Sequence, residues 1–258
     1  MTKKIDLIIK NGSYVTHKET IKDDIAVHKG KIYRVGDLSD LKAFKTIDAK
    51  GLHILPGAID TQVHFREPGN TDKEDLKSGS RAAVAGGITT VFDMPNNNPS
   101  MSTKTLFKKK LNSAKNRMFC NYAFYFGAEK NNTAEIKKME KEVGCCGIKV
   151  FVGVSTGTLI VSDYKDIKRI MKSTKKMISF HSEDQNELNK REKFIKRGDP
   201  KSHPKWRNES VCLICTKNLV KLANQTKKKI HILHITTAEE IEFLNKNKKY
   251  VSYEVTPQ

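Results

Sequence analysis

Hydrophobic and polar residues alternate in short runs over the first part of the chain. Three such runs are "KIDLIIKNGSYVT", "DDIAVHKGKIYRVGD" and "KTIDAKGLHILPG". Alternation with a period of two, interrupted by Asn-Gly and Lys-Gly turns, is typical of β-hairpins. We therefore predict a small β-sandwich portion over residues 1–55.

From Pro56 onwards the pattern changes to buried strands that alternate with stretches long enough for crossover helices. Repeated βα units favour a parallel sheet, either a barrel or a doubly wound sheet. No G-x-G-x-x-G motif opens a helix, which argues against a dinucleotide-binding fold. Only seven strands are expected, which is one βα unit fewer than a complete eight-stranded barrel contains. They are Ala58–Phe65, Ile88–Asp93, Cys120–Phe126, Gly147–Val152, Met177–His181, Ile230–Ile235 and Val251–Val255.

One connecting helix has clear end signals. Thr71 and Glu74 have the spacing of a capping box, an alanine-rich stretch follows, and Gly86 and Gly87 end it.

The net charge of +19 raises the question of a nucleic-acid or membrane partner. Forty of the 48 basic residues are Lys (48 − 8 Arg), and the lysine runs lack interleaved aromatic residues. Nucleic-acid readers rely on arginine forks and stacking rings, so we expect a lysine-rich surface and no nucleic-acid partner. No apolar window approaches the roughly 18–20 residues of a membrane span, and a cytoplasmic protein is expected. The five cysteines are expected to be reduced, with Cys212 and Cys215 in the core.

The stretch "PGAIDTQVHFREPG" carries the first candidate site residues. Alternate side chains of a strand share a face, so Asp60, Gln62 and His64 are expected to point the same way. His64 and Arg66 lie at the carboxyl end of this strand, where active sites of βα barrels are found. Three inward polar groups favour a site over an ordinary barrel strand.

Three further strands add candidates of two kinds, a lysine and histidines. Lys149 lies within the apolar run "GIKVFVG", and a buried ammonium is costly. Either its stem carries the charge to the strand end, or the lysine is modified or shifted in pKa. His181 and His234 end their strands, and parity predicts that only one of His231 and His234 faces the interior. Imidazoles gathered at one barrel mouth suit Zn²⁺, and the loop "DMPNNNPS" would flank this mouth.

Taken together and in order, these motifs resemble dihydroorotases of the amidohydrolase superfamily. The resemblance covers nearly the whole chain. The motifs are "DTQVHFREPG", "KEDLKSGSRAAVAGGITTVFDMPNNNP", "GIKVFVG", "HSED", "HILHITT" and "EVTP". This resemblance implies a metal-dependent-hydrolase-type TIM barrel over residues 56–258 that lacks its eighth βα unit, beside a composite β-sandwich.

The resemblance also implies roles for single residues. His64, Lys149, His181 and His234 match metal ligands, with Lys149 as a carbamylated lysine that bridges two zinc ions. Arg66 and Asn96 match groups that hold the substrate carboxylate, where an Arg fork fits the geometry.

The implied activity is reversible, metal-assisted hydrolysis of dihydroorotate to N-carbamoyl-aspartate in pyrimidine biosynthesis. Gln62 replaces the first histidine of the usual H-x-H, so one metal position is expected to be weak. The general-base Asp of the family is expected beyond Gln258.

Two alternatives remain beside this interpretation. One is a non-catalytic dihydroorotase-like scaffold protein, and the other is a related cyclic amidase of the allantoinase or hydantoinase type. The expected partner is a small-molecule substrate, and a homo-oligomer is left open.

Overall fold

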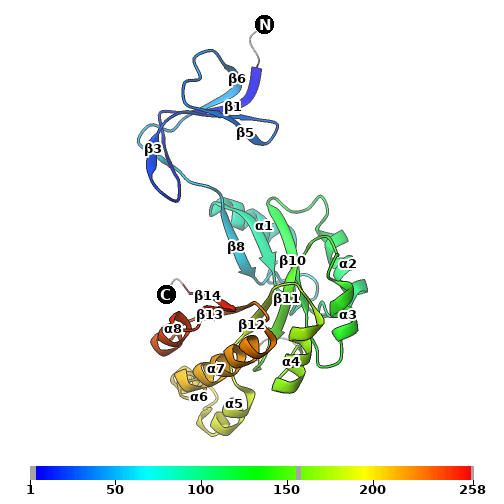
Figure 1. Ribbon diagram of the computed structural model, residues 1–258. Helices are drawn as coiled ribbons and strands as arrows, with labels where there is room; N and C mark the ends of the chain where they lie inside the picture. Colours follow the sequence, from blue (N-terminus) through cyan, green and yellow to red (C-terminus); the bar gives the residue numbers. More distant parts are fainter. Residues whose placement is uncertain (1–3, 155–157, 257–258) are drawn as a thin grey trace. The chain divides into compact units, whose positions relative to one another are not determined.

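The computed structural model describes residues 4–154 and 158–256 (Figure 1). The chain divides into two compact units, one ending at Ala58 and the other beginning at Ile59. The division of the chain into domains after residue 55 stays a prediction.

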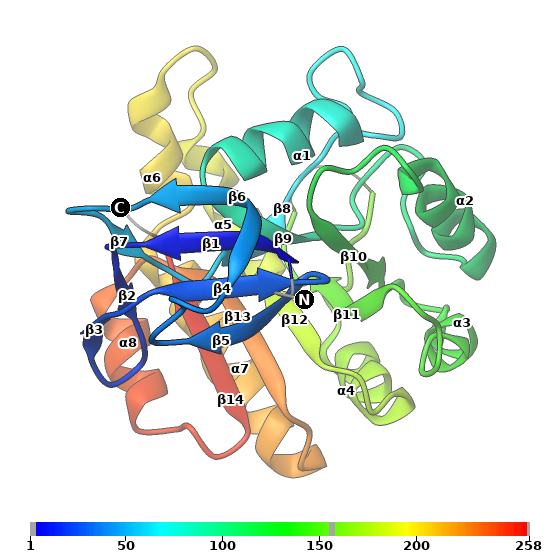
Figure 2. The same ribbon diagram turned by 90° about the horizontal axis from the view of Figure 1, so that it is seen from above.

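The N-terminal unit consists of two small sheets. Figure 2 shows the larger one, in which four strands lie in the order β5-β4-β1-β6. Its strands are β1 (Lys4–Lys10), β4 (Ile25–His28), β5 (Lys31–Val35) and β6 (Lys42–Asp48). The smaller sheet has the order β3-β2-β7, with β2 (Ser13–Val15), β3 (Thr20–Lys22) and β7 (His53–Ile54). Ile5, Ile8, Ala26 and Leu38 form a small buried core, so the β pattern expected for this part of the chain is confirmed.

The second unit is built around one curled seven-stranded sheet in the order β14-β13-β12-β11-β10-β9-β8. The paired strands from β9 to β14 run parallel. The seven expected strands are all present, with ends within two residues of the prediction. They are β8 (Ala58–Val63), β9 (Ile88–Asp93), β10 (Asn121–Gly127), β11 (Cys145–Phe151), β12 (Ile178–His181), β13 (Ile230–Ile235) and β14 (Val251–Val255). The fold class is therefore confirmed.

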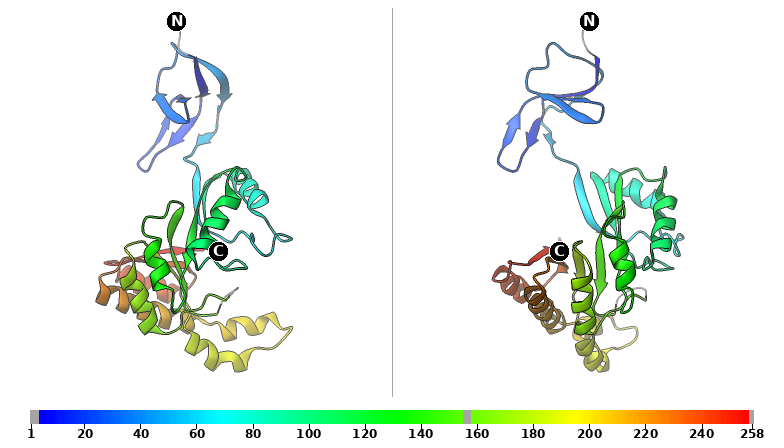
Figure 3. Two further views of the ribbon diagram at one scale, coloured as in Figure 1. Left: turned by 90° about the vertical axis from the view of Figure 1, so that its right-hand side faces the viewer. Right: turned by 45° about the vertical axis from the view of Figure 1, so that its right-hand side comes forward.

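Helices follow the strands and cover one face of this sheet, as Figures 1 and 3 show. They are α1 (Leu76–Ala85), α2 (Lys104–Ala114), α3 (Thr133–Lys138), α4 (Tyr164–Ser173), α5 (Gln185–Arg191), α6 (His203–Trp206), α7 (Glu209–Thr226) and α8 (Ala238–Asn245), with short 3₁₀ turns η1 (Glu192–Phe194) and η2 (Pro200–Ser202). In the part of the chain that the structure describes, no helix is long and apolar enough to cross a membrane.

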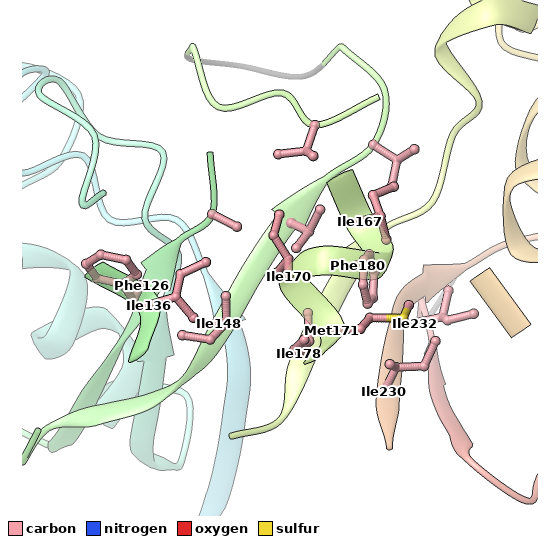
Figure 4. Close-up of a cluster of buried hydrophobic side chains, with 14 of the residues drawn as sticks. Phe126, Ile136, Ile148, Ile167, Ile170, Met171, Ile178, Phe180, Ile230 and Ile232 are labelled. Carbon is pink, nitrogen blue, oxygen red and sulfur yellow. The ribbon is translucent and has the colours of Figure 1, made fainter. Parts of the chain in front are cut away.

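The main hydrophobic core lies between the sheet and these helices. Figure 4 shows Ile148 and Phe180 of the sheet beside Ile170 and Met171 of α4, all of them buried. Successive strand residues point to opposite faces, so apolar residues on the helix side leave the other face free for polar groups. That second face carries the candidate site.

The start of α1 corrects a prediction. The capping box is formed by Asp75, which accepts a hydrogen bond from the Ser78 backbone, and not by Thr71 and Glu74. The Ser78 hydroxyl in turn accepts from the Asp75 N–H at 3.1 Å. Thr71 and Glu74 do not cap the helix because the backbone around Thr71 forms turns, in which the Lys73 N–H donates to the Asn70 carbonyl.

Candidate metal and substrate site

Two of the predicted site residues meet at the carboxyl ends of β12 and β13. His181 Nδ1 lies 3.0 Å from His234 Nε2, and the ring centroids are 4.9 Å apart. Burial lowers the pKa of both imidazoles, that of His234 to about 3. Both rings are therefore neutral at pH 7, the form that can donate a lone pair to a metal.

The orientation of the His181 ring is set by a carboxylate. His181 Nε2 donates to Glu183 Oε2 at 2.6 Å, which leaves Nδ1 with its lone pair on the side of His234. Arg207 donates to the same Glu183 oxygen and to the Val154 carbonyl, the latter at 2.6 Å. Such carboxylate–histidine pairs fix the tautomer and orientation of metal-binding imidazoles.

A bulge in β13 corrects the parity argument for its two histidines. The pairing with β14 shifts between Ile232 and Ile235, and His234 has a left-handed backbone with φ of 45°. His231 contacts Glu254 at 3.2 Å, and His234 contacts His181, so both imidazoles lie on the face opposite the helices. Strict alternation is wrong here because a bulge inserts one extra residue.

His64 follows β8 and is held by Asn96 of the loop after β9. Its Nδ1 lies 2.8 Å from Asn96 Oδ1, so Nδ1 carries the proton and Nε2 keeps a lone pair. Burial lowers the pKa of His64 to about 4, and the charges of Lys149 and Arg66 contribute to the same shift. The structure thus brings Asn96 against a predicted metal ligand.

Lys149 of β11 is the most deeply buried of the predicted site residues, at 1% exposed. Its Nζ lies 4.5 Å from the centroid of the Phe151 ring. No residue within 4–154 or 158–256 gives this amine a hydrogen bond or an ion pair. Burial therefore lowers its pKa far below the usual value, and its charge depresses the pKa of His64, His181 and His234.

Arg66 lies two residues beyond His64 and is half-buried. Its guanidinium has no hydrogen-bond or ion-pair partner among the described residues, although its charge depresses the pKa of His64. The five donors of a guanidinium match a carboxylate in geometry, so Arg66 has the donors that an anionic ligand group requires.

One acidic residue was missed by sequence reasoning. Glu254 of β14 accepts from Thr61 of β8 at 3.2 Å and contacts His231 at the same distance. It is also the carboxylate whose charge counteracts the lowered pKa of Lys149. The only sequence signal was an acidic residue within the otherwise strand-like "VSYEV", which sequence reasoning did not use.

Two cavities have His234 in their lining. One of about 360 Å³ is lined by His181, Glu183 and Arg207, and the other, of about 410 Å³, by Gln62 and Glu254. Volumes of this size accommodate a small cyclic molecule.

The donor set fits a borderline divalent metal at the His181–His234 pair. Two imidazole nitrogens bound to one zinc ion at about 2.0–2.1 Å are about 3.0–3.4 Å apart, depending on the bond angle, and the observed separation is 3.0 Å. Within the described ranges, no three His, Cys, Asp or Glu side chains are gathered closely enough to form a complete site. Further donors therefore have to come from other groups, such as Lys149.

A family model describes this same stretch of chain. Residues 53–253 match the model of the amidohydrolase family. The chain belongs to the amidohydrolase family. This amidohydrolase is 29% identical over 251 residues to the dihydroorotase of Thermococcus kodakarensis. The match covers 97% of the chain and 56% of the relative. The chain is 32% identical to the dihydroorotase of Pyrococcus horikoshii, covering 98% of the chain and 55% of the relative.

An allantoinase of Escherichia coli is similar to this amidohydrolase as well, with 30% identity over 92% of the chain and 54% of the relative. The chain spans about half the length of the curated relatives that it matches. Among solved structures, the L-hydantoinase (dihydropyrimidinase) from Arthrobacter aurescens superposes with a TM-score of 0.90 at 24% identity, over 98% of the chain and 58% of that protein. This similarity shows the fold alone.

Proposed function

We propose that this amidohydrolase is of the dihydroorotase type and takes part in the reversible hydrolysis of dihydroorotate to N-carbamoyl-aspartate. The observation that carries the proposal is the unpaired guanidinium of Arg66 beside His64. Dihydroorotate carries a carboxylate on its ring, whereas the rings of hydantoin and allantoin carry none. The charge of Arg66 beside the proposed metal ligand His64 therefore favours dihydroorotate among the substrates of this family.

The proposed metal ligands are His64, His181, His234 and Lys149. A divalent metal bound there supplies Lewis acidity for an amide carbonyl and activates water. His64 is held for this role by Asn96, and His181 by Glu183. Burial lowers the pKa of Lys149 far below its usual value, which favours the neutral amine that carbamylation requires. The carbamate would replace a costly buried cation with an anionic oxygen donor.

In this proposal Arg66 and Asn96 hold the substrate carboxylate, and Asn96 also orients His64. The assignment of residues 1–55 to a β-sandwich portion and of residues 56–258 to the barrel belongs to the same proposal.

A second candidate function is favoured by Gln62. A neutral amide at this position is a weaker zinc ligand than imidazole, and its backbone N–H donates to Asp60 Oδ1 at 2.9 Å. A dihydroorotase-like protein with an impaired first metal position would serve as a non-catalytic scaffold.

The test is a substrate comparison with the purified protein and Zn²⁺. Dihydroorotate, allantoin and hydantoin are each incubated, and the ring-opened products are quantified together with bound metal. Turnover of dihydroorotate above the other two supports the dihydroorotase proposal. Bound metal with no turnover of any of the three contradicts it and favours the scaffold.

A further inference from the structure

A buried ion pair lies on the helix side of the site residues. Lys110 of α2 is 3% exposed, and its Nζ lies 2.6 Å from Asp93 Oδ2 at the end of β9, which is 0% exposed. The same Nζ donates to Asn97 Oδ1 at 2.6 Å, and Asn97 is also buried. We refer to Lys110, Asp93 and Asn97 as the Lys110 clamp.

The clamp holds both backbone polar groups of one residue, Phe65. Asp93 Oδ1 accepts from the Phe65 N–H at 3.0 Å, and Asn97 Nδ2 donates to the Phe65 carbonyl at 2.9 Å. Asn97 also donates to the Glu67 carbonyl at 3.2 Å. Lys110 joins the two side chains that make these contacts, so the backbone at Phe65 is fixed from both sides.

Phe65 lies between the two residues that the proposed chemistry depends on. His64 precedes it and Arg66 follows it, and Asn97 adjoins Asn96, which bonds His64. A change in the backbone at Phe65 therefore redirects the imidazole and the guanidinium together. An error of about 1 Å in such groups costs roughly a hundredfold in rate.

The energetic cost of the clamp points in the same direction. A buried ion pair contributes little net stability, since desolvation offsets the attraction between the charges, and an apolar pair of similar volume is often as stable. Here Asp93 Oδ1 and Asn97 Nδ2 both bond the backbone of Phe65, between His64 and Arg66. A role in orientation accounts for these contacts better than a role in stability.

We infer that Lys110 is a positioning residue, which acts through Asp93 and Asn97 to hold His64 and Arg66 in their working orientation. The expected effect of Lys110 on substrate turnover rests on the proposed function. Its expected effect on the backbone of residues 64–70 is independent of that proposal.

The test compares Lys110→Met with Lys109→Met, its exposed neighbour on the same helix. Amide hydrogen exchange is measured by mass spectrometry, because it reports local opening segment by segment. We expect Lys110→Met to accelerate exchange at residues 64–70 and 94–98 by about tenfold or more while α7 exchanges as in the wild type. Lys109→Met is expected to match the wild type throughout. Unchanged exchange at 64–70, or an equal increase over the whole chain, overturns the inference.

Asn97→Leu provides a second variant that leaves the Lys110–Asp93 charges paired. It is expected to accelerate exchange at 64–70 even if Lys110→Met fails to fold, and a wild-type exchange pattern in Asn97→Leu overturns the inference.

Kinetic measurements separate the positioning role of Lys110 from the proposed dihydroorotase function. With dihydroorotate, a positioning role raises KM by about tenfold in both variants because Arg66 is misdirected, and it also lowers kcat because His64 is misdirected. If the wild type turns over no dihydroorotate but exchange changes locally, the proposed function fails and the positioning role of Lys110 stands.

Discussion

His181 Nδ1 and His234 Nε2 face each other across 3.0 Å, although the two residues are 53 positions apart in the chain. The orientation of each ring has a structural cause. Glu183 accepts a hydrogen bond from His181 Nε2 on the opposite side of the ring, and the bulge in β13 turns His234 inwards. This separation supports the proposal that both nitrogens bind one metal ion.

The first prediction concerns metal removal. Zn²⁺ at a thousandfold excess over its Kd should stabilise the wild type by about 4 kcal/mol, because metal binds the folded state. His234→Asn should lose most of this stabilisation. Asn suits the left-handed backbone at this position, so the variant removes the ligand without adding strain. Thermal unfolding with and without Zn²⁺ measures the effect, and an equal Zn²⁺ stabilisation of both proteins would contradict the prediction.

A second prediction concerns the number of metal ions. Gln62 offers a weaker ligand than the imidazole it replaces, so the wild type should hold about one Zn²⁺ per chain and Gln62→His about two. Elemental analysis after dialysis against micromolar Zn²⁺ gives the ratio. The same number of bound ions in both proteins would show that Gln62 does not weaken the first position.

Gly79 provides the third prediction. A Cβ at this position would lie 2.5 Å from Phe65 Cε1, so Gly79→Ala must displace the ring between His64 and Arg66. Gly→Ala in a helix ordinarily stabilises by about 1 kcal/mol, whereas overpacking a core costs about 1–3 kcal/mol. We expect net destabilisation in urea unfolding.

The matched control for this variant is Gly86→Ala, at the end of the same helix. Gly86 has φ of −87°, and an added Cβ meets nothing closer than 3.5 Å. The control should be neutral within about 0.5 kcal/mol. If Gly79→Ala is as stable as Gly86→Ala, the packing of Phe65 against α1 is looser than described.

The fourth prediction concerns pH. Burial raises the pKa of Glu240 above its usual 4.5, although Thr216 and Thr237 donate hydrogen bonds to it. The folded protein therefore holds this proton more tightly than the unfolded chain, and stability falls as pH rises through the window that begins near 4.5. Glu240→Gln does not titrate, so it should be more stable than the wild type at pH 7, with a difference that shrinks towards pH 4. Urea unfolding midpoints of both proteins across this pH range test the prediction. A stability difference that grows on acidification contradicts it.

The strands and the four ligand candidates could be predicted because their signals are local. A strand such as Ile88–Asp93 is an uninterrupted apolar run, and His181 and His234 stand at the ends of such runs. Their convergence follows from the parallel sheet, since the carboxyl ends of neighbouring strands lie together.

The residues that sequence reasoning missed depend on contacts between distant segments. Lys110 lies within a lysine run of an ordinary amphipathic helix, and nothing in the sequence shows that it is buried beside Asp93. Glu183 is paired with Arg207, 24 residues away, across a stretch of short helices. The bulge at His234 was missed for a related reason, because pairing with β14 determines it and the run itself alternates normally.

The central claim is that Arg66 selects a ring that carries a carboxylate, and substrate preference in Arg66→Gln tests it most directly. The purified protein with Zn²⁺ is assayed for ring opening of dihydroorotate and of the uncharged dihydrouracil. We predict that the wild type favours dihydroorotate and that Arg66→Gln lowers kcat/KM for it by about a hundredfold, since a charge-assisted pair is worth roughly 3 kcal/mol. Dihydrouracil turnover should be unaffected. Equal losses with both substrates, or no loss with dihydroorotate, would contradict the account.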